Sequence, residues 1–170
     1  MKNIIINDEH LQSSNVNKFG SKSRAVLIQD NKILLSNYGG VFLLPGGSIE
    51  KNETPDDAII RELSEEIGIN YNINELKPFL TLKYYQPNYP TRYNDVINRM
   101  ITTYYYLGQY KGINADKFHR TDGEIKDNFY LQLIEIEELS QLLNQQSDNP
   151  RKEYFDREIN EVIKALSFHK

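Results

Sequence analysis

The chain contains no cysteine, and this absence removes several kinds of chemistry at once. Without thiols there is no disulfide bond, no thiolate zinc site and no cysteine nucleophile. The lack of cysteine favours an intracellular setting, and we predict a cytoplasmic location. Long apolar runs are missing too, since the first ten residues, MKNIIINDEH, hold only three consecutive apolar residues. Such a run is too short for a signal peptide or a membrane span, so no membrane partner is expected.

Positive charge is not in surplus either, because 20 Lys and Arg stand against 24 Asp and Glu, for a formal net charge of −4. There is thus no general electrostatic reason for the chain to bind nucleic acid. A polyanionic ligand would have to be met by local cations or by a metal ion. Internal repeats, low-complexity segments and long Gly, Ser or Pro linkers are also absent, so the sequence predicts one domain over residues 1–170.

Short runs of β-branched and aromatic residues predict several strands. Asp30 and Asn31 separate the first two runs and predict a hairpin there. In the run TTYYYLG, alternation places Tyr104 and Tyr106 on one face of the sheet and Tyr105 on the other. The predicted strands lie at residues 23–29, 32–38, 79–86, 96–108 and 129–136.

Helical patterns occupy the last third of the chain. A short helix is expected over 137–145 and a longer one over 151–168. The longer helix carries an apolar stripe that we predict to be core, made of Phe155, Ile159, Val162, Ile163 and Leu166. Together with the strands, these helices predict a layered α/β or α+β domain around a mixed sheet.

A third helix is predicted between Thr54 and Gly68. Thr54 is a good N-cap, Pro55 suits the first helical position, and Gly68 is a good C-terminal stop. One face of this helix is apolar, and a neighbouring face carries three glutamates, Glu62, Glu65 and Glu66. Like charges three and four residues apart repel by roughly 0.2–0.5 kcal/mol per pair. A partner that offsets this repulsion is therefore expected, and a hard divalent cation with oxygen ligands fits the pattern.

The glutamates belong to a longer motif with fixed spacing. Its residues are, in order, Gly47, Glu53, Arg61, Glu62, an apolar Leu63, Glu65, Glu66, Gly68 and an apolar Ile69. Seven fixed identities at this spacing arise by chance on the order of once in 10⁸ starting positions. The segment resembles the complete box of the Nudix hydrolase superfamily, and the preceding VFLLPGG is similar to the family's lead-in.

This resemblance implies a Nudix-type α/β/α sandwich around a mixed β-sheet. It also implies a Mg²⁺- or Mn²⁺-dependent pyrophosphohydrolase, which splits a nucleoside diphosphate linked to another group. The classes left open are ADP-ribose, dinucleoside polyphosphates, nucleotide sugars and NTPs. Nucleic acid is expected at most as an RNA 5′ end, and an oligomer is left open. The alternative is a silent or sensing Nudix module that binds a nucleotide ligand without hydrolysing it.

Within the box, the resemblance gives each residue a role. Glu62, Glu65 and Glu66 would bind the metal ion together with the backbone carbonyl of Gly47. Glu62 or a loop acid would be the general base, and relatives differ on this point. Arg61 would orient the carboxylates. Glu53, as its ion-pair partner, and Gly68 would be structural.

Outside the box, we single out four further candidates. Glu124 lies in a polar loop where relatives place an extra metal ligand or base. Arg24 and Arg99 are candidate phosphate contacts, because guanidinium pairs well with phosphate oxygens. Tyr85 is the candidate for stacking on a nucleobase, with Tyr84 and Tyr89 as alternatives.

Overall fold

The computed structural model describes residues 1–93, 95–119 and 128–167. Its eight described strands form one mixed sheet in the order β1-β6-β7-β2-β3-β4, with β5 paired to β2 and β8 paired to β3. β1 pairs with β6, and β7 with β2, in parallel, whereas the other pairs are antiparallel. The strands are β1 (Lys2–Ile6), β2 (Lys18–Gln29), β3 (Lys32–Tyr38), β4 (Val41–Leu43), β5 (Gly46–Ser48), β6 (Lys77–Pro90), β7 (Val96–Gln109) and β8 (Tyr130–Glu135).

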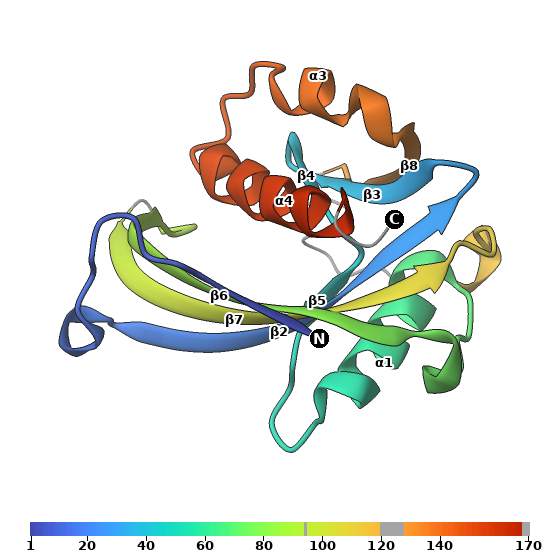
Figure 1. Cartoon of the computed structure of the whole chain (residues 1–170), viewed down its shortest axis with the longest axis horizontal. Helices are drawn as coiled ribbons and strands as arrows, with labels where there is room; N and C mark the ends of the chain where they lie inside the picture. The colour runs from blue at the N-terminus through green and yellow to red at the C-terminus, as the bar shows by residue number, and fades with distance from the viewer. Residues whose placement is uncertain (94, 120–127, 168–170) are drawn as a thin grey trace.

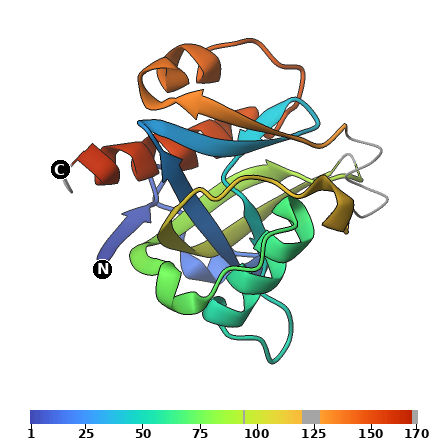
Figure 2. The ribbon, with the colours of Figure 1, turned by 90° about the vertical axis from the view of Figure 1, so that its right-hand side faces the viewer.

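Helices cover both faces of this sheet. α1 (Pro55–Ile67) lies on one face, while α3 (Leu139–Leu143) and α4 (Lys152–Ser167) lie on the other (Figures 1 and 2). This arrangement confirms the predicted mixed α/β sandwich. No helix in the described part of the chain is both long and apolar enough to cross a membrane.

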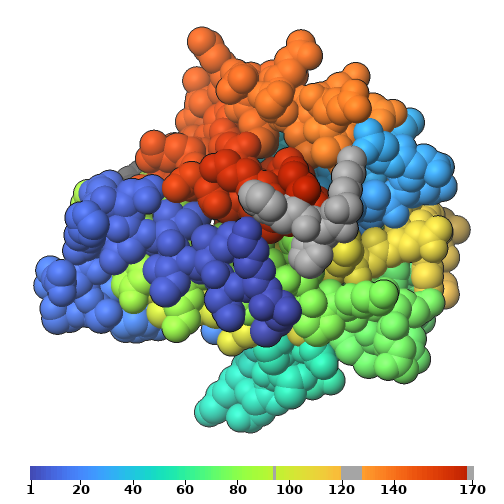
Figure 3. All heavy atoms as spheres, in the orientation of Figure 1, coloured from blue at the N-terminus to red at the C-terminus, as the bar shows by residue number. Residues whose placement is uncertain are grey.

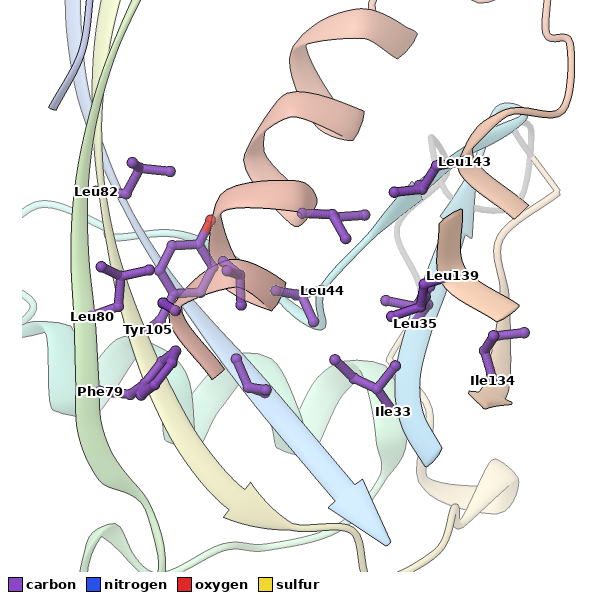
Figure 4. Close-up of a cluster of buried hydrophobic side chains, with 14 of the residues drawn as sticks. Ile33, Leu35, Leu44, Phe79, Leu80, Leu82, Tyr105, Ile134, Leu139 and Leu143 are labelled. Atoms are coloured by element: carbon purple, nitrogen blue, oxygen red, sulfur yellow. The ribbon is translucent and has the colours of Figure 1, made fainter. Parts of the chain in front are cut away.

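The sheet separates two apolar clusters, and strand alternation sorts residues between them. Val26 and Tyr105 belong to the cluster under α4, whereas Leu27 and Tyr106 belong to the cluster under α1. Tyr104 packs against the α1 cluster too, so the predicted split of the three tyrosines is confirmed. Figure 4 shows the α4 cluster, where the Tyr105 hydroxyl points toward α4.

The apolar stripe of the last helix is core, as predicted. Ile159 and Val162 are buried in the α4 cluster, and Ile163 and Leu166 pack against it. Phe155 is buried as well but lies at the edge of a cavity described below. The N-terminal segment lies beside α4 (Figure 3), where Arg157 is 3.3 Å from Asp8.

The hairpin and the α1 caps are also confirmed. Asp30 and Asn31 have positive φ angles of 48° and 64°, which suit a tight turn between strands. Thr54 accepts a hydrogen bond from the Asp57 backbone N–H at 3.1 Å. Gly68 ends the helix with φ 69°, in the left-handed region that glycine tolerates best.

Several sequence boundaries were wrong. The first five residues after Met1 form β1, which was not predicted, because its strand character depends on pairing with β6. β2 begins at Lys18 instead of residue 23, since its polar first half pairs with β7. The helix expected over 137–145 is a 3-10 turn over Ile136–Glu138 followed by the five-residue α3. β6 and β7 likewise extend beyond the predicted bounds.

Candidate active site

The Pro-Gly-Gly turn is held against β2 by backbone pairing. Gly46 lies opposite Arg24, and Gly47 lies opposite Ser23. A Cβ atom on Gly46 would come within 2.2 Å of the Ser23 carbonyl oxygen, and its φ of 124° is strained for any other residue. At Gly47 a Cβ would come within 2.4 Å of the Glu62 carboxylate. Gly46 is thus required for the close approach of turn and strand, whereas a side chain at Gly47 would have to displace the Glu62 carboxylate.

Arg61 organises the carboxylates of the box. Its Nε and Nη2 donate to the two oxygens of Glu53 at 2.8 and 3.0 Å, a bidentate pair. Its Nη1 donates to Glu62 at 2.9 Å and to Glu65 at 3.3 Å. Nη2 also donates to the Ser48 carbonyl oxygen at 3.0 Å, which ties the helix to the end of β5. The expected Glu53–Arg61 ion pair is therefore present.

These contacts shift the acidity of the groups involved. The hydrogen bond from Arg61 lowers the pKa of Glu53. The same carboxylate raises the pKa of the Arg61 guanidinium. Burial raises the pKa of Glu62, and Arg61 offsets part of this effect. Arg61 thus lowers the pKa of Glu53 and opposes the rise in the pKa of Glu62 that burial causes.

Glu66 is held from the other side. It is 9% exposed and accepts a hydrogen bond from the Gly46 backbone N–H at 2.9 Å. Glu65 is the most exposed of the three helix glutamates that were predicted to bind metal, with 40% of its side chain accessible. In residues 1–93, 95–119 and 128–167, no three Asp, Glu or His side chains converge closely enough to hold a metal ion.

The donor set nevertheless suits a hard cation. Glu62, Glu66, Gly46 and Gly47 line one cavity of about 410 Å³, which brings two carboxylate side chains and the backbone of the turn to the same space. Glu65 lies one helical turn beyond Arg61 and would have to leave that contact to join them. Carboxylate and carbonyl oxygens are the ligands that Mg²⁺ and Mn²⁺ prefer. These residues therefore fit a divalent ion. Because Gly47 has no Cβ, it leaves space for the Glu62 carboxylate beside it.

Other residues that line this cavity form a cationic and aromatic wall. They come from β2, the end of β3, the end of β6, the segment just before α4 and α4 itself, and sequence reasoning missed most of them. From the sequence, Arg24 was predicted as a phosphate contact, Tyr89 as an alternative for nucleobase stacking, and Phe155 only as part of the apolar core. Lys22 was detectable, because it lies two residues before Arg24 and so on the same face of the strand. The wall consists of Lys22, Arg24, Tyr38, Tyr89, Asn149, Arg151 and Phe155.

The two predicted arginines differ in their surroundings. Arg24 is 4% exposed and donates through Nη1 to the carbonyl oxygens of Leu44 and, at 3.3 Å, Gly46. Its Nε lies 3.7 Å from Glu158, so Arg24 mainly fixes the turn before the box. Arg99 stacks on Tyr89, with Cζ 3.1 Å from the ring centroid, and its Nε donates to Gln86 at 2.5 Å.

Tyr85 does not reach this cavity. It lines a different hollow of about 280 Å³ with Asp8, Tyr84 and Arg157 among its neighbours. Its hydroxyl is 3.5 Å from that of Ser13. Of the three tyrosines considered, Tyr89 is the one that lines the candidate site. Glu124 lies outside the described residues.

Comparisons with known proteins agree with the fold described above. A family model described as NUDIX domain matches residues 12–157. The NUDIX hydrolase from Nitrosomonas europaea has a TM-score of 0.55 at 19% identity, covering 85% of this chain and 90% of that chain. The MutT protein from Methanosarcina mazei has a TM-score of 0.54 at 14% identity, covering 84% and 94%. At these identities, the two structures show a common fold.

Curated relatives match over shorter stretches. An 8-oxo-dGTP diphosphatase from Proteus vulgaris is 57% identical over 37 residues, which are 22% of this chain and 33% of that protein. An ADP-ribose pyrophosphatase from Methanocaldococcus jannaschii is 39% identical over 56 residues, which are 30% of this chain and 33% of that protein. The chain thus spans about a third of the length of these two relatives.

Proposed function

Because the chain belongs to the NUDIX family, we propose that it is a metal-dependent pyrophosphohydrolase acting on a nucleoside diphosphate derivative. The observation that carries this proposal is one cavity that is lined both by Glu62, Glu66 and Gly47 and by cations with aromatic rings. The first set suits a divalent ion, and the second suits phosphate and a nucleobase. The names of the curated relatives support the reaction class.

Glu62, Glu65, Glu66 and the Gly47 carbonyl would hold Mg²⁺ or Mn²⁺. Such an ion, when bound, neutralises phosphate charge and lowers the pKa of a bound water. The chain's own part is to position these ligands. Arg61 and Glu53 keep Glu62 in place through the bidentate ion pair and the 2.9 Å contact. Glu62 or a loop acid, for which Glu124 is the candidate, would accept the proton of the attacking water.

The test is hydrolysis of a substrate panel with Mg²⁺ or Mn²⁺. ADP-ribose, a dinucleoside polyphosphate, a nucleotide sugar, dNTPs and 5′-triphosphorylated RNA cover the open classes. Turnover of at least one compound is expected. Tight binding of a nucleotide without product after long incubation would support the sensing module instead and overturn the enzyme proposal.

Glu66→Gln makes this test specific for the box. Gln keeps an oxygen that accepts from the Gly46 N–H, so the fold should survive. We expect turnover to fall by at least two orders of magnitude, because metal ligation contributes several kcal/mol and each 1.36 kcal/mol is about tenfold in rate. The rise in melting temperature on adding Mg²⁺ should shrink as well.

Glu50→Gln is the matched control, because Glu50 is exposed and occupies a position that the motif leaves free. It should keep wild-type turnover and the full response to Mg²⁺. Near wild-type activity and the same Mg²⁺ response in Glu66→Gln would show that α1 is not the metal site.

A further inference from the structure

Glu158 is a buried carboxylate that lies outside the Nudix box. It belongs to α4, is 7% exposed and does not line the candidate cavity. Its carboxylate accepts a hydrogen bond from the Tyr105 hydroxyl and lies 3.7 Å from Arg24 Nε. Burial raises the pKa of Tyr105, and the charge of Glu158 adds to this rise, so the hydroxyl keeps its proton for this bond. A buried carboxylate is costly unless it is paired, so its partners indicate its role.

Arg24 connects Glu158 to the turn that precedes the box. The Arg24 side chain is buried, and its Nη1 donates to the carbonyl oxygens of Leu44 and Gly46. The N–H of the same Gly46 donates to Glu66 at 2.9 Å. Gly46 is thus held by Arg24 through its carbonyl oxygen and by a proposed metal ligand through its N–H. Because a glycine with φ 124° has no side chain to fix it, these hydrogen bonds set its orientation.

Arg24 also lies close to the carboxylates that are proposed to bind metal. Arg24, Glu62 and Glu66 line the same cavity. Burial raises the pKa of Glu62, and the charge of Arg24 is one of those that oppose this rise. A guanidinium keeps its proton, so without Glu158 the side chain of Arg24 would be drawn toward these glutamates and would compete with a metal ion for them.

We propose that Glu158 is a positioning residue for the metal centre, which acts by holding Arg24 on the turn before the box. With Arg24 held there, the Gly46 N–H stays on Glu66, and the guanidinium leaves the box glutamates free for a metal ion. This inference rests on the proposed function and adds to it a residue of α4, on the face of the sheet opposite α1 (Figure 1).

The first experiment measures Mn²⁺ affinity by isothermal titration of the protein without nucleotide. Glu158→Gln removes the charge but keeps the size of the side chain and an oxygen that can accept from the Tyr105 hydroxyl. Its dissociation constant for Mn²⁺ should rise about fivefold or more, because Arg24 then competes for the glutamates.

Two variants of the same helix serve as controls. Val162→Ala opens a cavity in the buried face of α4 and so lowers stability without touching the turn. Glu161→Gln removes an ion-paired carboxylate. Both should bind Mn²⁺ within roughly twofold of wild type, because neither changes the surroundings of Arg24. An equal loss of affinity in Val162→Ala and Glu158→Gln would overturn the inference.

Hydrogen exchange of the Gly46 amide, followed by NMR, tests the turn in the metal-free protein. Exchange should be about tenfold faster in Glu158→Gln than in Val162→Ala, because a released Arg24 no longer holds the carbonyl oxygens of the turn. Tyr105→Phe removes only the hydroxyl that donates to Glu158. It should shift Mn²⁺ affinity and Gly46 exchange in the same direction by a smaller amount, and it decides the question if Glu158→Gln does not fold.

The variant Arg24→Met tests whether Glu158 acts through Arg24. Adding Glu158→Gln to Arg24→Met should change the Mn²⁺ affinity by less than about twofold, because the guanidinium that Glu158 restrains is gone. A further fivefold loss in the double variant would refute this route. Wild-type Mn²⁺ affinity together with wild-type Gly46 exchange in Glu158→Gln would overturn the inference as a whole.

Activity gives a separate readout if a compound of the panel is hydrolysed. Turnover of Glu158→Gln at limiting Mn²⁺ should fall about fivefold or more, saturating Mn²⁺ should restore most of it, and KM for the nucleotide should not rise. A loss that saturating Mn²⁺ leaves unchanged would contradict the inference. If no compound is hydrolysed, the proposed function fails, while Mn²⁺ titration and Gly46 exchange still decide the role of Glu158.

Discussion

Replacing Lys22 by Met should stabilise the folded protein, and this gain should depend on pH. Burial among other cations lowers the Lys22 pKa from 10.5 to about 7. This difference corresponds to roughly 5 kcal/mol at 1.36 kcal/mol for each pKa unit, which is an upper bound. Water reaches the partly exposed lysine, and Met loses the attraction to Glu158, so we expect a gain of about 1–3 kcal/mol. Met keeps the packing of the side chain near Phe155, whose ring centroid lies 5.9 Å from Nζ.

The sign follows from the two pKa values. Below pH 7, Lys22 is protonated in both the folded and the unfolded protein. The folded protein then carries the full free-energy cost of the buried charge. Between pH 7 and 10.5, the folded state releases the proton while the unfolded state keeps it, so the cost declines. It is absent above 10.5. The stabilising effect of Lys22→Met should therefore be largest below pH 7 and smaller at pH 9.

Urea denaturation at pH 6 and pH 9, without nucleotide or metal, measures both effects. Lys18→Met should change the free energy of unfolding by less than about 0.5 kcal/mol at either pH, because its side chain is exposed. Destabilisation by Lys22→Met at pH 6, or an equal gain at both pH values, would refute the reasoning. Among the described residues, the charged groups that set the Lys22 pKa are Arg24, Arg99, Arg151 and Glu158, and Glu62 and Glu66 line the same cavity.

Two further predictions concern the turn and the buried ion pair. Gly47→Ala should fold, because its Cβ meets only the movable Glu62 carboxylate, but its kcat should fall at least tenfold. Gly46→Ala should instead lower the melting temperature, because its Cβ meets backbone atoms. A lower melting temperature in Gly47→Ala with unchanged kcat, or an unchanged melting temperature in Gly46→Ala, would contradict these roles. Glu158→Gln removes the carboxylate that faces Arg24 and accepts from the Tyr105 hydroxyl, so it should cost about 3 kcal/mol in urea denaturation. A loss below about 1 kcal/mol would show that the pair is not structural.

Much of α1 was predictable because its signals are local. Capping at Thr54, the stop at Gly68 and the apolar face all depend on residues within a few turns of one another. The contact between Glu53 and Arg61 spans only eight positions. By contrast, β1 and the first half of β2 are strands because β6 and β7 pair with them. The short β1 and the polar first half of β2 show no period of their own that reveals such pairing.

The same distinction explains why the acidic wall of the site was visible in the sequence and the cationic wall was not. Glu62, Glu65 and Glu66 are close in the chain, and one helix brings them together. Lys22 is within electrostatic reach of Arg99, which lies on the neighbouring strand β7, and of Arg151, which precedes α4 and donates to Pro90 at the end of β6. Each cation alone looks like an ordinary surface residue. Their mutual repulsion exists only after folding, because it depends on tertiary contacts that the box does not contain.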